Sequence, residues 1–209
     1  FDLSHAGKGK SHGWFFFTCY NSEQANTLLE VNASQNDKDF IMAVNWKKAE
    51  EYIKAGKGKI EKTKYAHNTW NDETHTGTSV IKDEVLVLDA MAMKDICYLM
   101  PCPKSPHGCD VDPTGEYIVG SGKLAALIPV FSFDKMVKAI GKKDYEGDYE
   151  GIPVLKYNSV LHGEVQKPGL GPLHTEFDGK GNAYTTFFVS SEVVKWYIKS
   201  LKVLDRFPT

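Results

Sequence analysis

Short apolar runs, separated by turn residues, recur along most of the chain and predict β-strands. The runs are too short for typical helices, are rich in aromatic and β-branched residues, and are bounded by Gly, Pro, Asn or Asp. Many short strands with frequent turns predict an all-β fold. The predicted strands span residues 14–19, 40–44, 84–89, 96–100, 116–120, 127–133, 183–190 and 192–198.

Helical spacing is confined to brief segments. Residues 46–55 (WKKAEEYIKA) have this spacing and end before Gly56, a suitable C-terminal cap. Asp134 is expected to cap a second short helix over residues 135–142. The other polar stretches are expected to be a long surface excursion and an acidic loop, at residues 56–79 and 144–151.

One sequence unit occurs twice, at residues 107–117 (HGCDVDPTGEY) and 174–184 (HTEFDGKGNAY). Each unit begins with a histidine, continues into a turn rich in Asp and Gly, and ends with a tyrosine that leads into an apolar strand. The two histidines are 67 residues apart, a span that fits four strands and their loops. A β-propeller blade is therefore the predicted repeating unit, and a β-sandwich is the structural alternative.

His107 and His174 are the candidate functional residues of the two units. In a propeller, equivalent positions of successive blades face a common axis, so the two imidazoles would converge there. Neutral imidazole is a common ligand of copper, zinc and iron. Two imidazoles do not complete a metal site, so a purely structural role for both histidines stays open.

A zinc site is the second metal interpretation, because Cys97, Cys102 and Cys109 lie near His107 in the sequence. Their spacing lacks the C-x2-C pairs of common zinc sites. Burial as small apolar side chains is the better account of Cys97 and Cys102, which flank a predicted strand. Farther upstream, Tyr20, Glu23 and Asp37 offer oxygen ligands that could clamp a loop around calcium.

The composition excludes several classes of partner. The chain has 209 residues, 42% of them hydrophobic and 25% charged, with a formal net charge of −2. Both signs of charge are interspersed, so no nucleic-acid partner is expected. No apolar run approaches the ~18 residues of a membrane span. The chain begins with Phe1 and shows no leader, so we expect a piece of a longer protein or a processed form.

Residues 101–133 and 170–197 resemble nitrous oxide reductase, the multicopper enzyme of denitrification. The YNSE motif at residues 20–23 and the segment VNWKKAEEYIKAGK at residues 44–57 agree with this resemblance. The wording around Cys109 and the SSEVVKW ending resemble the branch that the general secretory route exports. The resemblance therefore implies a periplasmic protein.

The family fold is a seven-bladed β-propeller followed by a cupredoxin domain that carries a dinuclear copper site. Residues 1–209 correspond to part of the propeller, and the cupredoxin domain is absent from them. The propeller axis of the family holds a sulfide-bridged four-copper cluster bound by seven histidines. The histidines of its PHG and LHT motifs match His107 and His174, and the other ligands have no match in this chain.

The family also binds calcium close to the cluster. Its ligands match Tyr20, Glu23 and Asp37, with Asp39 as an alternative to Asp37. Two positions depart from the family pattern, at Val31 and Ser105. Family metal sites also need groups that orient the imidazoles, for which Asp110 and Glu176 are candidates, although a surface role fits both equally.

The implied activity is the two-electron, two-proton reduction of nitrous oxide to dinitrogen and water. The implied partners are nitrous oxide, a small electron donor such as a cytochrome c or a cupredoxin, and a second copy of the full-length protein in a homodimer. The segment alone is expected to be inactive. The alternatives are a non-catalytic β-propeller that serves as a binding or assembly module, and a propeller enzyme of another class. A c-type haem enzyme would need a C-x-x-C-H motif, which the chain lacks.

Overall fold

Strands dominate the computed structural model, which describes residues 4–19, 39–71, 74 and 76–209. The strands are β1 (Ser4–Ala6), β2 (Trp14–Cys19), β3 (Phe40–Asn45), β4 (Lys59–Asn71), β5 (Thr76–Val87), β6 (Cys97–Pro101), β7 (Pro106–Val111), β8 (Tyr117–Gly122), β9 (Leu127–Ser132), β10 (Tyr145–Tyr149), β11 (Ile152–Leu155), β12 (Leu161–Gln166), β13 (Pro172–Phe177), β14 (Asn182–Phe187), β15 (Glu192–Tyr197) and β16 (Lys202–Pro208). The helices are η1 (Gly9–Ser11, a 3-10 helix), α2 (Trp46–Lys54), α3 (Phe133–Lys142) and α4 (Tyr157–Val160).

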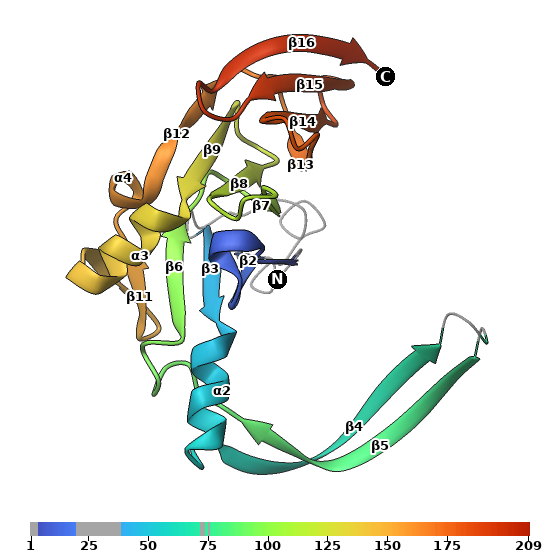
Figure 1. Cartoon of the computed structure of the whole chain (residues 1–209), viewed down its shortest axis with the longest axis vertical. Helices are drawn as coiled ribbons and strands as arrows, with labels where there is room; N and C mark the ends of the chain where they lie inside the picture. Colours follow the sequence, from blue (N-terminus) through green and yellow to red (C-terminus); the bar gives the residue numbers. More distant parts are fainter. Residues whose placement is uncertain (1–3, 20–38, 72–73, 75) are drawn as a thin grey trace, which may run out of the picture.

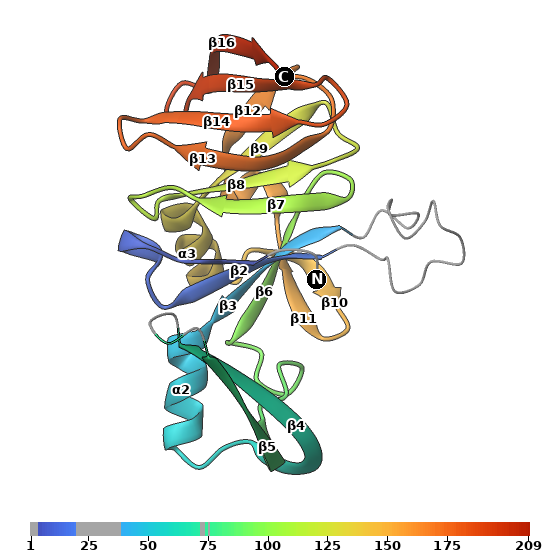
Figure 2. The same cartoon turned by 90° about the vertical axis from the view of Figure 1, so that its right-hand side faces the viewer.

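The sheets stack in series, as propeller blades do. Two of them are four-stranded and antiparallel, with the strand orders β12-β9-β8-β7 and β13-β14-β15-β16. The first sheet has the order β1-β2-β3-β6-β11-β10. The strand β7 contacts β2 of the first sheet and β13 of the last sheet. Figure 2 shows the sheets lying one above the next. This arrangement confirms the predicted all-β fold built of propeller blades.

The middle blade buries both of its faces. Ile118 and Phe131 belong to a core shared with the first sheet, around Phe16 and Met100. Their neighbours in the sequence, such as Val119, belong to a second core shared with the last blade. The alternation of side chains along a strand sends successive residues into opposite cores. Because both cores are apolar, the first half of β8 and most of β9 are continuous hydrophobic runs rather than alternating ones.

A hairpin from the middle blade extends the first sheet. β10 and β11 lie between β9 and β12 in the sequence, and β11 pairs in parallel with β6 through Val154 and Leu99. The expected acidic loop at residues 144–151 is therefore wrong, because residues 145–149 form β10. The acidic side chains of β10 are exposed while its backbone pairs with β11. An edge strand that faces solvent can carry polar and acidic residues, so its composition resembles that of a loop.

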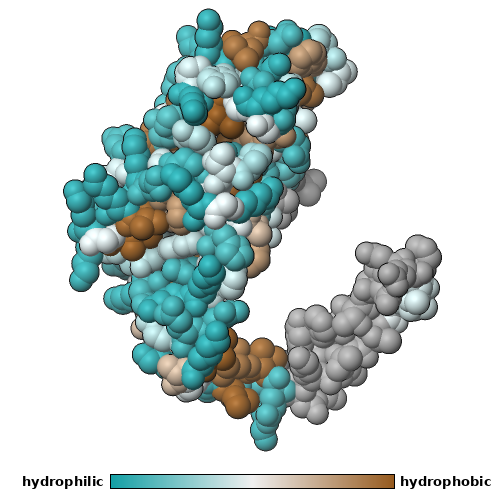
Figure 3. Space-filling view, viewed as in Figure 1, coloured by the Kyte–Doolittle hydropathy of each residue, from teal (hydrophilic) through white to brown (hydrophobic). Residues whose placement is uncertain are grey.

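A long two-stranded ribbon replaces the surface excursion expected over residues 56–79. β4 and β5 pair with each other along their length and leave the body of the molecule (Figure 1). Exposed apolar side chains, including Ile60 and Leu86, lie at the base of the ribbon, where Figure 3 shows a hydrophobic area. The strand predicted at residues 84–89 overlaps the end of β5, whereas the polar composition of residues 59–79 concealed β4 and the start of β5.

The two longer helices, α2 and α3, begin at side-chain caps. Asn45 accepts the backbone N–H of Lys48 and caps α2, as Asn commonly does. Ser132, and not the expected Asp134, caps α3 by accepting the N–H of Lys135. None of the helices within the described ranges has the length and apolar character that a bilayer crossing needs.

The backbones of β7 and β13 approach closely at Gly108. A Cβ atom added to Gly108 would lie 2.0 Å from the carbonyl oxygen of Leu173, a distance that real Cβ atoms do not show. The residue after His107 must therefore be glycine if the two blades are to keep this spacing.

The variant Gly108→Ala is expected to lower the free energy of unfolding by about 1–3 kcal/mol, because the new methyl group forces the blades apart. Gly141 is the matched control: it lies in α3, and nothing comes within 4 Å of a Cβ added there. Gly141→Ala is expected to raise the free energy of unfolding by up to about 1 kcal/mol. Urea unfolding of both variants checks this, and equal midpoints would contradict the close approach.

Candidate metal centre

Both histidines occupy β-bulges near the start of an innermost strand. In β7, Pro106 pairs with Gly122 and Gly108 pairs with Ser121, which leaves His107 as the extra residue. A β-bulge bends the strand and redirects a side chain, and bulges are frequent beside functional sites.

The second bulge has the same place in its blade. In β13, Pro172 pairs with Phe187 and Thr175 pairs with Thr185, so Leu173 and His174 together face a single residue of β14. The repeated sequence unit therefore includes a β-bulge in both blades. The bulge gives each histidine an equivalent position in its blade.

The two imidazole rings meet between the neighbouring blades. The ring centroids of His107 and His174 are 4.9 Å apart, with an angle of 67° between the ring planes. Both side chains are half-buried, so solvent reaches the pair. The convergence that the sequence predicts for these two histidines is what the structure has.

An aspartate organises the turn that follows each histidine strand. Asp112 accepts the backbone N–H of Tyr117 at 2.8 Å and that of Thr114 at 3.1 Å. Asp178 accepts the N–H of Lys180 at 2.8 Å and that of Asn182 at 3.1 Å. Such bonds let an aspartate replace backbone partners in a tight turn. The two units therefore share a similar pattern of turn hydrogen bonds as well as a similar sequence.

Asp110 and Glu176, the candidates for orienting the imidazoles, lie in different surroundings. Glu176 is exposed on β13. Asp110 is only 6% exposed, and its Oδ2 accepts the backbone N–H of Thr175 at 2.6 Å. The hydrogen bond of Asp110 therefore reaches the strand that carries His174, through the residue next to that histidine.

His5 is a neighbour of this site that sequence reasoning missed. Its Nδ1 accepts the backbone N–H of Val111 at 3.2 Å and lies 3.6 Å from Oδ1 of Asp110. An Nδ1 atom that accepts a hydrogen bond carries no proton, so in this tautomer the contact with Asp110 is not an ion pair. His5 sits in a Gly- and Lys-rich stretch without a motif, and no local signal marks it.

Of the residues proposed to bind calcium, only the alternative Asp39 lies in the described part of the chain. Tyr20, Glu23 and Asp37 lie outside the described residues. The alternative, Asp39, is 4% exposed, and its Oδ2 accepts the backbone N–H of Ser105 at 2.6 Å. Asp39 and Ser105 are therefore adjacent, although 66 residues separate them in the sequence.

Two other histidines, His162 and His12, contact protein groups away from the pair. His162 packs against the ring of Tyr117, and its Nε2 lies 3.3 Å from the carbonyl oxygen of Lys199. His12 makes an edge-to-face contact with Trp46. Across the described part of the chain, no group of three or more His, Cys, Asp or Glu side chains is arranged to hold a metal ion. His107 and His174 thus supply a pair of ligands and not a whole shell.

Cys97 and Cys109 are buried, whereas Cys19 and Cys102 are partly exposed. All four are thiols rather than disulfide sulfurs. Burial raises the pKa of Cys97 to about 11 and also raises the pKa of Cys102 and of Cys109. Cys109 is fully buried, and its thiol donates to the carbonyl oxygen of Phe16 at 3.3 Å. These surroundings favour the neutral thiol, whereas zinc needs the thiolate.

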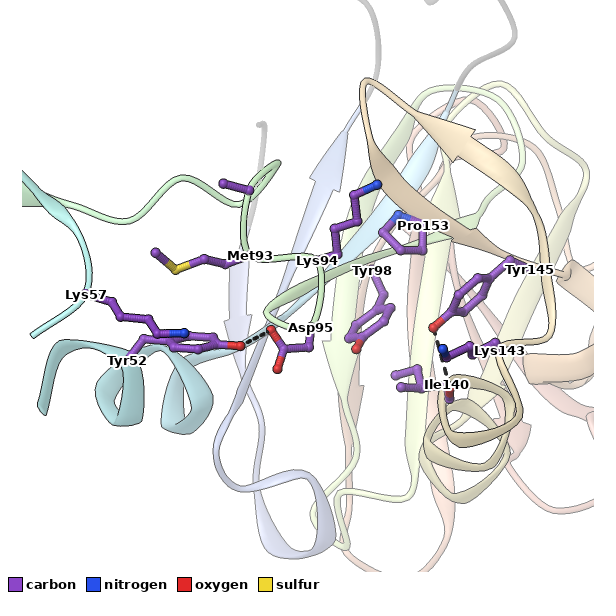
Figure 4. A pocket seen from close by; sticks show the side chains of 11 residues that line it. Tyr52, Lys57, Met93, Lys94, Asp95, Tyr98, Ile140, Lys143, Tyr145 and Pro153 are labelled. Atoms are coloured by element: carbon purple, nitrogen blue, oxygen red, sulfur yellow. Dashed lines mark hydrogen bonds between the residues drawn. The ribbon is translucent and has the colours of Figure 1, made fainter. Parts of the chain in front are cut away.

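A separate cleft of about 470 Å³ lies on the outer side of the first sheet. Figure 4 shows Tyr52, Tyr98 and Tyr145 around it, with the hydroxyl of Tyr52 donating to Oδ1 of Asp95 at 2.6 Å. Burial raises the pKa of Tyr98 to about 12, so its phenol stays neutral. The cleft shares no residue with the histidine pair.

Comparisons with known proteins identify relatives of this chain. No family model matches it. The nitrous-oxide reductase of Stutzerimonas stutzeri is 34% identical over 181 residues, which are 86% of this chain and 24% of the relative. The chain is related to nitrous-oxide reductase. The enzyme of that name from Pseudomonas fluorescens is 34% identical over 179 residues, and that from Cupriavidus necator is 40% identical over 94 residues.

The chain spans about a quarter of the length of the nitrous-oxide reductases from Stutzerimonas stutzeri and Pseudomonas fluorescens. Among solved structures, Kuenenia stuttgartiensis hydrazine synthase superposes with a TM-score of 0.42 and 12% identity, over 91% of this chain and 57% of that chain. This likeness is too weak to inform the function.

The buried thiols are expected to resist alkylation in the native protein. At pH 8 a pKa of about 11 leaves about one Cys97 thiol in a thousand ionised, and the thiolate is the reactive form. Iodoacetamide should therefore leave Cys97, Cys102 and Cys109 unmodified in the folded protein and modify all three in urea. Peptide mass spectrometry checks this, and rapid labelling of the folded protein would contradict it.

Proposed function

We propose that this chain is part of the catalytic propeller of a nitrous-oxide reductase, in which His107 and His174 bind the copper cluster. The observation that carries the proposal is the meeting of the two imidazoles, 4.9 Å apart, from equivalent bulges of neighbouring blades. The relatives named nitrous-oxide reductase support the same reaction.

The residues present fit copper. A metal–imidazole bond of about 2.0 Å places the ion about 3 Å from the ring centroid. Two rings with centroids 4.9 Å apart are close enough to belong to one copper site. Neutral imidazole suits copper, and two of the nearby cysteines, Cys97 and Cys109, are buried in the apolar core, away from this role.

The reaction is N2O + 2H⁺ + 2e⁻ → N2 + H2O. The copper cluster, when bound, supplies the electrons and a binding place for a gas that is otherwise inert. The part of this chain is to hold two imidazoles rigidly: each bulge directs its ring between the blades, and the close approach of Gly108 to Leu173 fixes the spacing of the two strands. Their half-buried position leaves the pair open to a small substrate.

Further parts of the full-length enzyme belong to the same proposal. The proposal includes the remaining histidine ligands, a cupredoxin domain with a dinuclear copper site, and a homodimer of the full-length protein. It also includes a small electron donor, a periplasmic location, and calcium bound by Tyr20, Glu23 and Asp37. Asp39 is the alternative to Asp37 in this set of ligands, and its Oδ2 accepts the backbone N–H of Ser105.

In the full-length protein, His107→Ala and His174→Ala are each expected to lower copper content and to abolish nitrous oxide reduction. Each change removes an imidazole that no neighbouring side chain replaces. Copper per protein is measured by elemental analysis after expression in copper-replete cells, and nitrous oxide consumption is measured by gas chromatography.

His162→Ala is the matched control, because His162 lies in the same blade as His107 but packs on Tyr117 instead. It should keep both copper and activity. Unchanged copper in both site variants would refute the ligand assignment. A full-length parent protein without copper would favour a non-catalytic binding or assembly module.

A further inference from the structure

One buried carboxylate links the strands that carry the two histidines. Asp110 lies three residues after His107 on β7. Its Oδ2 accepts the backbone N–H of Thr175, the residue that follows His174 on β13, at 2.6 Å. A buried carboxylate that accepts a hydrogen bond over so short a distance makes a strong bond. The carboxylate therefore bridges the two inner strands beside both imidazoles.

β7 contacts the residues on both sides of His174. The backbone of Gly108 lies against the carbonyl group of Leu173, where an added Cβ would be 2.0 Å from the oxygen. Asp110 holds Thr175 on the other side. His174 is thus held between two fixed points on the strand of His107, so the spacing of the histidines follows from these contacts.

A buried network makes Thr175 a rigid anchor. Its Oγ1 lies 2.7 Å from Oγ1 of Thr185, which accepts the indole N–H of Trp196 at 2.9 Å. Thr175 is 2% exposed, and Thr185 and Trp196 are fully buried. The network ties β13 to β14 and β15, so the bond from Asp110 attaches the strand of His107 to the whole last blade.

The first sheet reaches the same carboxylate. His5 on β1 lies 3.6 Å from Oδ1 of Asp110 and accepts the N–H of Val111. Asp110 therefore sits where β1, β7 and β13 of the described chain come together. The hydrogen bond from Thr175 to this carboxylate can fix the relative position of the middle and last blades, which a contact within one blade cannot do.

We propose that Asp110 is a positioning residue, which sets the separation of His107 and His174 and thereby the copper affinity of the pair. This inference rests on the proposed function. Removing the acceptor leaves the N–H of Thr175 buried without a partner and lets the two blades shift. Loss of such a supporting group typically lowers metal affinity about 10–100-fold.

The test compares Asp110→Ala with Asp110→Asn in the copper-loaded full-length protein. The asparagine keeps an oxygen that can accept the N–H of Thr175, whereas alanine keeps none. We expect Asp110→Ala to lose copper to a chelator at about 10–100-fold lower chelator concentration than the parent, with an altered copper absorption spectrum. Asp110→Asn should retain both properties.

Asp112→Ala is the matched control for general destabilisation. Asp112 is also buried in the same blade, but its bonds serve only the turn after β7. It should lower the unfolding midpoint while leaving the copper spectrum unchanged. The proposal is overturned if Asp110→Ala keeps the parental copper retention and spectrum, or if Asp112→Ala changes them equally.

Amide hydrogen exchange of the copper-free protein separates this inference from the proposed function. The N–H of Thr175 should be protected in the parent and in Asp110→Asn, and should exchange faster in Asp110→Ala. Equal protection in all three would overturn the bridging role, whatever the copper content. A parent protein that takes up no copper would instead refute the proposed function, and the exchange data would then decide the bridge alone.

Discussion

The backbones of two neighbouring blades meet at Gly108 and Leu173, and the candidate site depends on this contact. A side chain at position 108 would collide with the opposite carbonyl group, so the blades can approach only at glycine. This approach brings the bulge of His107 beside that of His174. It also brings the carboxylate of Asp110 within hydrogen-bond reach of β13, which locks the spacing that the glycine permits.

Packing on both faces of the middle blade holds this contact in place. Ile118 faces the core shared with the first sheet, and Val119 faces the core shared with the last blade. Each fully buried aliphatic side chain stabilises the fold by about 1.5–3 kcal/mol, so a shift of either neighbouring sheet would lose many such contributions. A site between stacked blades is therefore rigid without a covalent link, as a set of fixed metal ligands requires.

The sequence predicted the parts of the fold that local chemistry determines. Apolar runs marked most core strands, and the two histidine units marked equivalent places in two blades. β10, β4 and the first part of β5 escaped because polar segments can pair through the backbone, which composition does not report. Residues 84–87 of β5 lie within the strand predicted at residues 84–89. Ser132 took the capping role expected of Asp134, because the helix starts earlier than its charge pattern suggested.

By itself, the sequence determined the class of fold, the two candidate histidines and their equivalent positions in a repeated unit. Strand periodicity, turn residues and repetition are local patterns, which can be recognised from residues close together in the chain. Only the tertiary structure decided that the rings of His107 and His174 meet, and that Asp110 and His5 stand beside them. These contacts join residues tens to more than a hundred positions apart. Their distances are set by how whole sheets pack, and no local pattern of residues encodes that.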